Sequence, residues 1–409
     1  MPPDKCVHCV ERCALFHCGN FFVKRKAWIS CETQANTLSI AHLPRGLLPQ
    51  ARYTLLTILF ARGCHASRSS HFSSRGYMTQ TASSTDPKVL VQRLLAPIAD
   101  DMKAVDDYIR AELASDVSRM HEISEYITSA GGKRMRPALL ILISRALGYK
   151  GDLCCYLGAT IELLHTATLM HDDVVDESNL RRGRPTANAR WGNGAAVLVG
   201  DFLYTRSFQM MVRAGNLRVM QALADAANRL SEGEVVQMVN AHDPSVDETR
   251  YFRVIERKTA CLFEAGARMA AAIAECSKEQ EEAVAQYALA LGNAFQIADD
   301  ILDYTGVAAD IGKNLGADLR EGKMTLPLIY TRELTTPEGR ALIDEAVRKG
   351  DGPFDKITKL VVDCGALDRC SLRAEAELER GRQALAKLPP SIFNESLLEL
   401  LSFTVRRDR

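Results

Sequence analysis

Three aspartates lie close together in the segment HDDVVDE, residues 171–177. Asp172 and Asp176 are four residues apart, so on an α-helix their side chains share one face, while Asp173 is rotated about 100° around the axis. The apolar stretch ATIELLHTATLM precedes them, so the carboxylates emerge from a helix otherwise suited to a protein core. Packed carboxylates repel one another unless a cation lies between them. Two same-face carboxylates suit Mg²⁺, which prefers oxygen ligands and shares its coordination shell with substrate phosphates.

The same arrangement occurs a second time, in QIADDILDY. Asp299, Asp300 and Asp303 repeat the spacing, again at the end of a long apolar stretch. One such motif is a weak indication, because a solvated acidic helix end also explains it. Two copies far apart in the sequence favour a site in which two helices present carboxylates to Mg²⁺ and a phosphorylated substrate.

Basic residues accompany both aspartate motifs, as a phosphate site requires. In GGKRMRP, residues 131–137, two glycines permit close backbone approach and a proline can begin a helix. Arginine suits bidentate contacts to phosphate oxygens, while lysine acts as a point charge. Singly, each basic residue could equally be a solvated surface residue; together with the acids they indicate phosphate binding. The candidate cations are Lys133, Arg134, Arg136, Arg181, Arg182, Lys258, Lys313 and Lys323.

Long helices are needed to position these residues. From Val89 onward, apolar residues recur every three or four positions, and we identify no strand. The sequence therefore predicts a single all-α domain over residues 78–409, a large helical bundle around a deep central cavity. The expected helices cover residues 89–115, 119–128, 137–147, 152–177, 195–213, 216–240, 247–273, 278–304, 323–333, 338–349, 354–364, 368–387 and 391–405.

Residues 1–77 differ in composition from the rest of the chain. They hold ten Lys or Arg against three Asp or Glu, and six of the twelve cysteines, without a sustained helical or strand period. The formal net charge of the whole chain is zero, which gives no argument for binding nucleic acid. The six remaining cysteines show no metal-binding spacing and fit a reducing compartment.

Three interpretations of residues 1–77 stay open. The segment CVHCVERC could form a zinc site, although no second spaced pair completes the pattern. The Arg- and Ser-rich segment ARGCHASRSSHFSSRGY has the composition of a transit peptide, which would indicate a mitochondrial enzyme. We favour translation starting at Met78, which makes residues 1–77 an unstructured extension and the protein a bacterial cytoplasmic enzyme.

The motifs together resemble one enzyme family. GGKRMRP, HTATLMHDDVVDESNLRRG, GDFLYTRSF, EGEVVQM, FQIADDILDY and GKNLGADLREGKMTLP occur in the order and approximate spacing of the trans-type polyprenyl diphosphate synthases. From about Val89 to the C-terminus, the chain looks most like the bacterial octaprenyl diphosphate synthases. The resemblance implies an isoprenoid synthase fold, a homodimer, and Mg²⁺-dependent condensation of isopentenyl diphosphate with an allylic diphosphate such as farnesyl diphosphate. One departure is Ala317, where the family often has a second acid before Asp318.

The resemblance also implies a role for individual residues. Mg²⁺ would be held mainly by Asp172, Asp176, Asp299 and Asp303, with Asp173 and Asp300 as the further metal-binding residues of the two motifs. The allylic diphosphate would lie on Arg181, Lys258 and Lys313. Isopentenyl diphosphate would lie on Lys133, Arg136, His165 and Arg182. Thr259 and Gln296 would direct oxygen dipoles at the allylic carbocation, although helix capping or a buried hydrogen bond would also explain either residue.

Product length is expected to depend on the helix that leads to the first aspartates. Ala167 and Thr168 precede Asp172 by five and four residues, and Leu164 and Ile161 lie one and two turns further back. Small side chains at the first two positions would leave a tunnel open, unless they merely permit close helix packing. We therefore expect a long all-trans product, C40 before C45, that supplies the side chain of a quinone such as ubiquinone.

Other functions stay open at this level. A geranylgeranyl diphosphate synthase would use the same chemistry, and a non-catalytic subunit of a heteromeric synthase would share the fold. A terpene cyclase is disfavoured, because it would normally replace the second aspartate motif with a different metal motif. Product release would bring peripheral membrane contact, although the chain shows no anchor.

Overall fold

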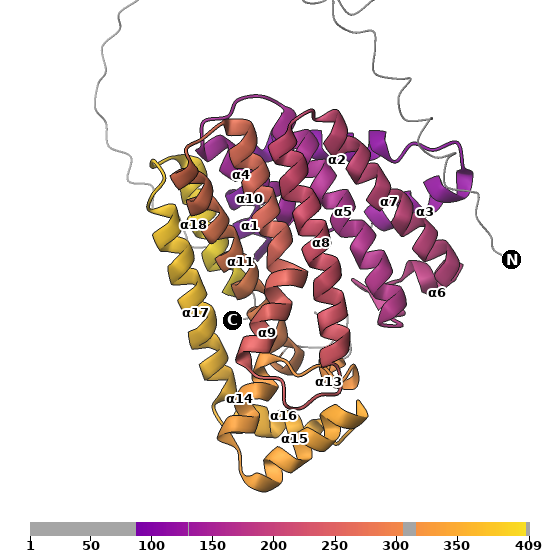
Figure 1. Ribbon diagram of the computed structural model, residues 1–409, viewed down its shortest axis with the longest axis vertical. Coiled ribbons are helices and arrows are strands. Elements are labelled where there is room, and N and C mark those ends of the chain that lie inside the picture. The colour runs from indigo at the N-terminus through magenta and orange to yellow at the C-terminus, as the bar shows by residue number, and fades with distance from the viewer. Residues whose placement is uncertain (1–86, 130, 306–315, 406–409) are drawn as a thin grey trace, which may run out of the picture. The chain divides into compact units, whose positions relative to one another are not determined.

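The computed structural model describes residues 87–129, 131–305 and 316–405. These residues belong to one of two compact units, Thr81–Arg409, whereas the unit Met1–Gln80 and the predictions for residues 1–77 lie outside the described residues. The described chain is helical apart from one short hairpin (Figure 1). The predicted all-α fold is confirmed.

Helices account for almost every element of the described chain. In chain order, the elements are α1 (Pro87–Leu95), the 3₁₀ turn η2 (Ala96–Ile98), α2 (Ala99–Glu112), α3 (Ser118–Ser129), α4 (Met135–Ala146), α5 (Leu153–Val175), β1 (Leu180–Arg181), β2 (Arg184–Pro185), α6 (Ala187–Trp191), α7 (Asn193–Arg213), α8 (Leu217–Asn240), α9 (Glu248–Ile255), the π-turn η3 (Glu256–Ala260), α10 (Cys261–Ala274), α11 (Lys278–Thr305), α13 (Ala317–Arg320), α14 (Leu326–Leu334), α15 (Pro337–Lys349), α16 (Phe354–Asp363), α17 (Ala366–Leu385) and α18 (Ile392–Val405).

The expectation of no strand was wrong in one place. β1 pairs antiparallel with β2, with Leu180 opposite Pro185. Arg182 and Gly183 connect the two strands with φ of 53° and 72°, the left-handed conformation that a two-residue hairpin turn requires at both positions. The sequence RRGR permits this turn because glycine adopts positive φ without steric cost. The hairpin directs the chain back toward the end of α5.

Two long helices expected from periodicity are interrupted. The first, predicted over residues 89–115, is divided into α1, η2 and α2, because Pro97 lacks a backbone donor and crowds the preceding turn. The second, predicted over residues 247–273, contains the π-turn η3. Apolar periodicity does not detect either interruption, since the buried face continues through both.

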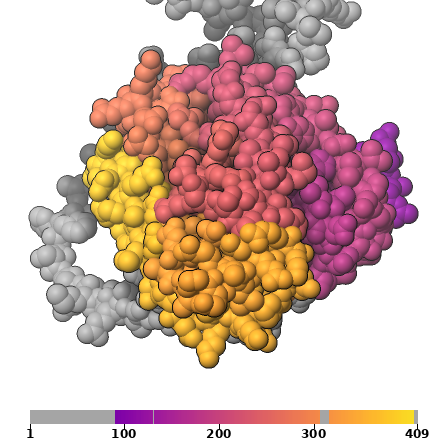
Figure 2. Space-filling model, turned by 60° about the horizontal axis from the view of Figure 1, so that its bottom comes forward, coloured from indigo at the N-terminus to yellow at the C-terminus, as the bar shows by residue number. Residues whose placement is uncertain are grey.

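Two apolar cores support the fold. The larger involves α2, α4, α5, α7, α8 and α10, and the smaller involves α9 and α14–α17. α11 contributes to both cores and packs against α10 and α17. Figures 1 and 2 show α14, α15 and α16 gathered at one end of this unit.

α5 is the one described helix that is long and apolar enough to cross a membrane. However, 78% of its most apolar window is buried inside the protein. Leu157, Ile161 and Leu164 on this helix have no exposed surface. We therefore interpret α5 as a central core helix whose last turn carries the first aspartate motif.

Candidate active site

A cavity of about 700 Å³ lies between the ends of α5 and α11. Asp172 and Asp176 from α5 line it, and Asp299, Asp300 and Asp303 from α11 line it as well. The two aspartate motifs, more than 120 residues apart, therefore face one space, as the spacing of each motif predicted. All donors of this set are oxygens, which fits a hard divalent cation.

The predicted cations surround the same cavity. Those that line it are Lys133, Arg134 and Arg136 at the start of α4, Arg181 and Arg182 in the hairpin, Lys258 in η3, and Lys323 after α13. Lys313 lies outside the described residues. The cavity therefore combines carboxylates with guanidinium and ammonium groups, as a metal-bound diphosphate needs, and Lys323 Nζ lies 3.6 Å from Asp176 Oδ1.

Asp172 lies in the cavity among other carboxylates. Burial, followed by the nearby carboxylates Glu234 and Asp176, raises the pKa of Asp172 to about 6 against the opposing effect of Lys258. Lys258 itself donates to Glu234 Oε2 at 2.7 Å. An added divalent cation would relieve this concentration of negative charge, so the residues present fit such a group.

Asp300 is held differently from its neighbours, because it is buried. Tyr251 Oη lies 2.6 Å from Asp300 Oδ2, and Gln296 Nε2 donates to Asp300 Oδ1 at 2.9 Å. Burial raises the pKa of Asp300 well above its ordinary value, and the carboxylate of Asp318 adds to this. Asp300 therefore serves as an anchor that orients Gln296 toward the cavity.

The π-turn η3 places Lys258 and Thr259 on the cavity wall. Thr259 Oγ1 donates to Gln296 Oε1 at 2.9 Å, which continues the hydrogen-bond chain from Asp300. Two glycines make room for this turn: a Cβ at Gly233 would lie 2.9 Å from the Lys258 nitrogen, and one at Gly292 would lie 2.6 Å from Ala260 Cα. π-Turns of this kind are frequently found at functional sites.

Asp303 lines the cavity and connects α11 to the residues at the start of α13. Its Oδ1 accepts hydrogen bonds from the backbone nitrogens of Gly316 and Ala317 at 3.1 and 3.2 Å, and its Oδ2 accepts from Asp318 at 3.3 Å. These bonds tie the end of α11 to the start of α13. Ala317, the position where the sequence departs from the family pattern, also lines the cavity.

Arg136 and His165 form a partly buried pair in the cavity wall. Arg136 Nη1 lies 2.9 Å from His165 Nε2, and the guanidinium carbon lies 4.6 Å from the centre of the Phe263 ring. Burial lowers the pKa of Arg136 to about 10, and the pKa of His165 falls well below 6.5 for the same reason, assisted by Arg136. The buried Arg136 Nε has no hydrogen-bond partner among the described residues, which leaves a donor for an anionic ligand.

Asp173 does not line the cavity, in contrast to our expectation of a metal ligand. Its buried carboxylate accepts from Arg181 Nε at 2.8 Å, and Asn188 Nδ2 donates to its backbone oxygen. Asp173 points away because it is rotated on the helix relative to Asp172 and Asp176. It therefore fixes the hairpin arginine beside the motif.

Of the four residues expected to control product length, only one lines the cavity. Thr168 lines the cavity, and its hydroxyl donates to the His165 backbone oxygen at 2.8 Å. Ala167, Leu164 and Ile161 are fully buried in the core and are not among the lining residues. A Cβ at Gly266 on α10 would lie 3.3 Å from Ile161 Cδ1, so α10 packs closely against α5 at Ile161.

Several cavity residues were not singled out from the sequence. Glu234 and Gln237 lie in the segment EGEVVQM. They are three residues apart, and Ala241 follows Gln237 by four, a spacing that could have indicated one helix face directed at the site. Tyr251 carries no such signal, since nothing in its neighbourhood predicts contact with Asp300. The further polar residues of this kind are Glu162, Asn240, Asp318 and Thr325.

Comparison with known proteins identifies the family of this chain. The model of the polyprenyl synthetase family matches residues 117–363. The chain belongs to the polyprenyl synthetase family. It is therefore a prenyltransferase, and members of this family use a divalent metal.

Three relatives define its position within the family. The octaprenyl diphosphate synthase of Escherichia coli is 45% identical over 76% of this chain and 97% of its own. The all-trans-nonaprenyl-diphosphate synthase (geranyl-diphosphate specific) of Rhodobacter capsulatus is 44% identical over 77% of this chain and 98% of its own. A polyprenyl synthase from Caulobacter crescentus, solved with calcium and isoprenyl diphosphate, matches with a TM-score of 0.76 and 38% identity over 78% of this chain and 98% of its own.

Proposed function

We propose that this polyprenyl synthetase is a long-chain trans-polyprenyl diphosphate synthase that makes octaprenyl diphosphate, C40, from farnesyl and isopentenyl diphosphates. The observation that carries the proposal is the single cavity onto which both aspartate motifs and the basic residues of α4, the hairpin and η3 converge. The octaprenyl and nonaprenyl synthases at 45% and 44% identity support a long chain. Their near-equal similarity leaves the exact length to experiment.

Mg²⁺ is the proposed metal, held by Asp172 and Asp176 on α5 and by Asp299 and Asp303 on α11. When bound, it supplies positive charge against the negative charge that develops on the departing diphosphate. Lys258 and Arg181 act on the same diphosphate and are held by Glu234 and Asp173. Lys313 is proposed as a further contact, although it lies outside the described residues.

Isopentenyl diphosphate is proposed to bind on the wall formed by Lys133, Arg136, His165 and Arg182. The unpartnered Nε of Arg136 supports this assignment, because a diphosphate oxygen would satisfy a buried donor. Lys133 Nζ lies 5.6 Å from the centre of the Phe403 ring, so the last described helix covers this wall. Positioning two diphosphates in one cavity holds the nucleophilic double bond beside the allylic carbon.

The proposed reaction needs no protein nucleophile, because the isopentenyl double bond attacks the allylic carbon. The chain contributes oxygen dipoles instead. Thr259 and Gln296 present oxygen atoms on the cavity wall, in an orientation fixed by Asp300 and Tyr251, and these oxygens would stabilise the allylic carbocation. The apolar lining residues Leu230, Val254 and Leu262 exclude water, which would otherwise capture the cation. After the double bond attacks, the proton is expected to leave with the released diphosphate.

The decisive test is product chromatography with the full-length protein. We expect farnesyl diphosphate, labelled isopentenyl diphosphate and Mg²⁺ to give a ladder of dephosphorylated products that ends near C40. A ladder ending at C20 would favour a geranylgeranyl diphosphate synthase. Absence of incorporation by folded protein would favour a non-catalytic subunit. A parallel assay of residues 78–409 would measure whether residues 1–77 contribute to the chemistry.

The biological setting follows from this proposal and from the sequence. A C40 diphosphate would supply the side chain of a quinone, and its hydrophobicity would require peripheral membrane contact on release. A homodimer stays a prediction. The location, bacterial cytoplasm or mitochondrion, depends on residues 1–77 and also stays a prediction.

A further inference from the structure

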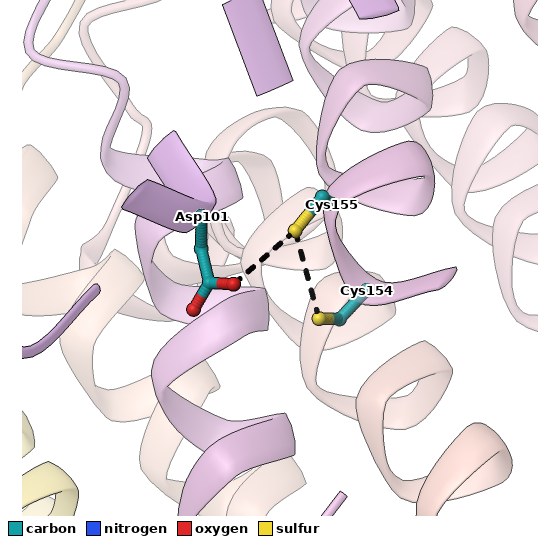
Figure 3. A group of neighbouring side chains, drawn as sticks. All are labelled: Asp101, Cys154 and Cys155. Atoms are coloured by element: carbon teal, nitrogen blue, oxygen red, sulfur yellow. Dashed lines mark hydrogen bonds between the residues drawn. The ribbon is translucent and has the colours of Figure 1, made fainter. Parts of the chain in front are cut away.

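A second cluster of potential ligands lies at the opposite end of α5 from the aspartates. Cys154 and Cys155 are adjacent in the first turn of α5, and Asp101 approaches them from α2. Figure 3 shows the carboxylate of Asp101 directed at Cys155 and the two sulfur atoms turned toward one another. Within the described residues, no other group of three His, Cys, Asp or Glu ligand atoms lies within 4.8 Å of one another.

The distances within this cluster match the edges of a tetrahedral zinc site. The two sulfur atoms are 3.9 Å apart, and Cys155 Sγ is 3.5 Å from Asp101 Oδ1. Two sulfurs at 2.3 Å from one zinc ion are separated by about 3.8 Å, and a sulfur and a carboxylate oxygen by about 3.6 Å. These two of the three ligand separations therefore match coordination spacing, and all three lie within 4.8 Å. Gly151 O, 3.4 Å from Cys154 Sγ, or water could complete the site.

Arg145 orients the carboxylate of this cluster. Its Nη2 and Nε donate to the two oxygens of Asp101 at 2.5 and 3.1 Å, and its Nη1 donates to the backbone oxygens of Tyr149 and Gly151. Metal-binding side chains are commonly fixed by such outer hydrogen bonds. The hydrogen bond between the two sulfurs lowers the pKa of Cys154 and raises the pKa of Cys155, and burial adds to the second effect, so a bound ion would have to displace the proton of Cys155.

Charge balance selects the type of ion. Asp101 and Arg145 already neutralise one another, so two thiolates leave two negative charges in a place where the cysteines are 0% and 2% exposed. A divalent ion restores neutrality, which a buried site requires. Thiolates are soft ligands that select Zn²⁺ and similar ions over Mg²⁺. This cluster and the aspartate cavity should therefore prefer different metal ions.

We propose that Asp101, Cys154 and Cys155 form a binding site for Zn²⁺, separate from the magnesium-dependent site. The bound ion joins the start of α5 to α2. Asp172 lies eighteen residues further along the same helix, about 27 Å along its axis, so the ion acts on stability and not on the chemical step. The Asp101 side chain is 20% exposed, which gives the ion a path from solvent.

Cadmium binding to the reduced, metal-free full-length protein tests this proposal. Cd²⁺ replaces Zn²⁺ and gives an ultraviolet thiolate charge-transfer band that carboxylate binding does not produce. We expect the double variant Cys154→Ala/Cys155→Ala to bind one equivalent fewer per chain and to lose the corresponding part of the band. The matched control, Cys364→Ala/Cys370→Ala, removes two thiols of the smaller core and should retain the wild-type stoichiometry. Because the double variant and the control both keep residues 1–77, metal bound to that segment contributes equally to the two stoichiometries.

A stability measurement guards against misfolding of the variant. Zn²⁺ should raise the thermal midpoint of the wild type and of the control, and it should not raise that of the double variant. Asp101→Asn keeps the size and loses the charged ligand, so its zinc affinity should fall while prenyl transfer stays at the wild-type rate. Equal cadmium stoichiometry in the double variant and the wild type would overturn the proposal, and so would an equal loss in the control.

Discussion

His165 Nε2 lies 2.9 Å from Arg136 Nη1, with both side chains in the wall of the cavity. Arginine only donates hydrogen bonds, so His165 Nε2 accepts, and the imidazole is neutral with its proton on Nδ1. This agrees with the low pKa that burial and Arg136 give to His165. The imidazole therefore orients Arg136 and does not add a charge to the site.

The first prediction concerns this orienting role. His165→Phe removes the acceptor, so we expect the KM for isopentenyl diphosphate to rise ~10–100-fold, the range that follows from losing a hydrogen bond to a charged group. The KM for the allylic substrate should change much less. His165→Asn can still accept from Arg136 and should recover part of the loss.

His121→Asn, on the exposed face of α3, is the matched control and should leave both constants unchanged. Steady-state kinetics with each substrate varied in turn provides the measurement. An equal rise in both KM values for His165→Phe would contradict a specific effect on the isopentenyl site.

The second prediction concerns the free energy of unfolding that is lost when the Asp172 carboxylate of the first aspartate motif is buried without a metal ion. A pKa of about 6 in place of 3.8 means that the folded, metal-free protein binds this proton more tightly than the unfolded chain does. The unfolding free energy should therefore fall as pH rises from about 4 to about 6, by roughly 3 kcal/mol at most. Asp172→Asn removes this cost, so at pH 7 without metal it should raise the thermal midpoint while prenyl transfer falls by orders of magnitude.

Mg²⁺ provides the internal control for that experiment. The cation should stabilise the wild type more than Asp172→Asn, because the variant lacks one carboxylate ligand. The gap between the two thermal midpoints should therefore narrow or reverse as Mg²⁺ is added. A gap that is independent of Mg²⁺ would argue against Asp172 as a ligand.

The third prediction links Glu234 to the acid side of the pH profile. Glu234 contributes to the raised pKa of Asp172 and accepts from Lys258 at 2.7 Å. Glu234→Gln should lower the pKa of Asp172, so the acid limb of the activity profile should shift to lower pH. The Mg²⁺ concentration needed below pH 6 should fall as well, since protons compete with the metal for this carboxylate.

Glu232→Gln is the matched control, since it lies on the same helix with its side chain 55% exposed. It should leave the pH profile in place. A shift of equal size in both variants would mean that the effect is one of general charge, not of the contact with the site.

Regular helical spacing explains which parts of the site could be predicted. Asp172, Asp176 and Asp299 could be predicted as site residues because each motif repeats the helical period on an apolar helix. That period determines which face of the helix a side chain occupies. The pairing of Asp173 with Arg181 could not be foreseen, because it depends on a hairpin whose two positive φ angles are set by local turn geometry. Tyr251 was missed because a buried tyrosine in the sequence resembles any core aromatic.

The same distinction applies to the predicted tunnel. Small residues near the aspartates indicate open space only if the facing helix leaves it empty, and sequence alone does not show the facing helix. Ile161 packs against Gly266 of α10, whose missing side chain leaves room for it, while Thr168 faces the cavity. Periodicity thus gave the face of α5 correctly, but it did not distinguish a packed position from an open one.

The last prediction separates these two positions by experiment. Thr168→Phe extends a ring into the cavity and should shorten the main product toward C15–C20, while the protein remains folded. Ala167→Phe inserts a ring where the core is fully packed, so it should lower the unfolding free energy by ~1–3 kcal/mol. Thr168→Val keeps the volume and should retain the wild-type product, which separates ring size from loss of the hydroxyl. Product chromatography and thermal unfolding of the three variants are the measurements. A long product from folded Thr168→Phe would mean that the growing chain leaves the cavity by a route that does not pass this residue.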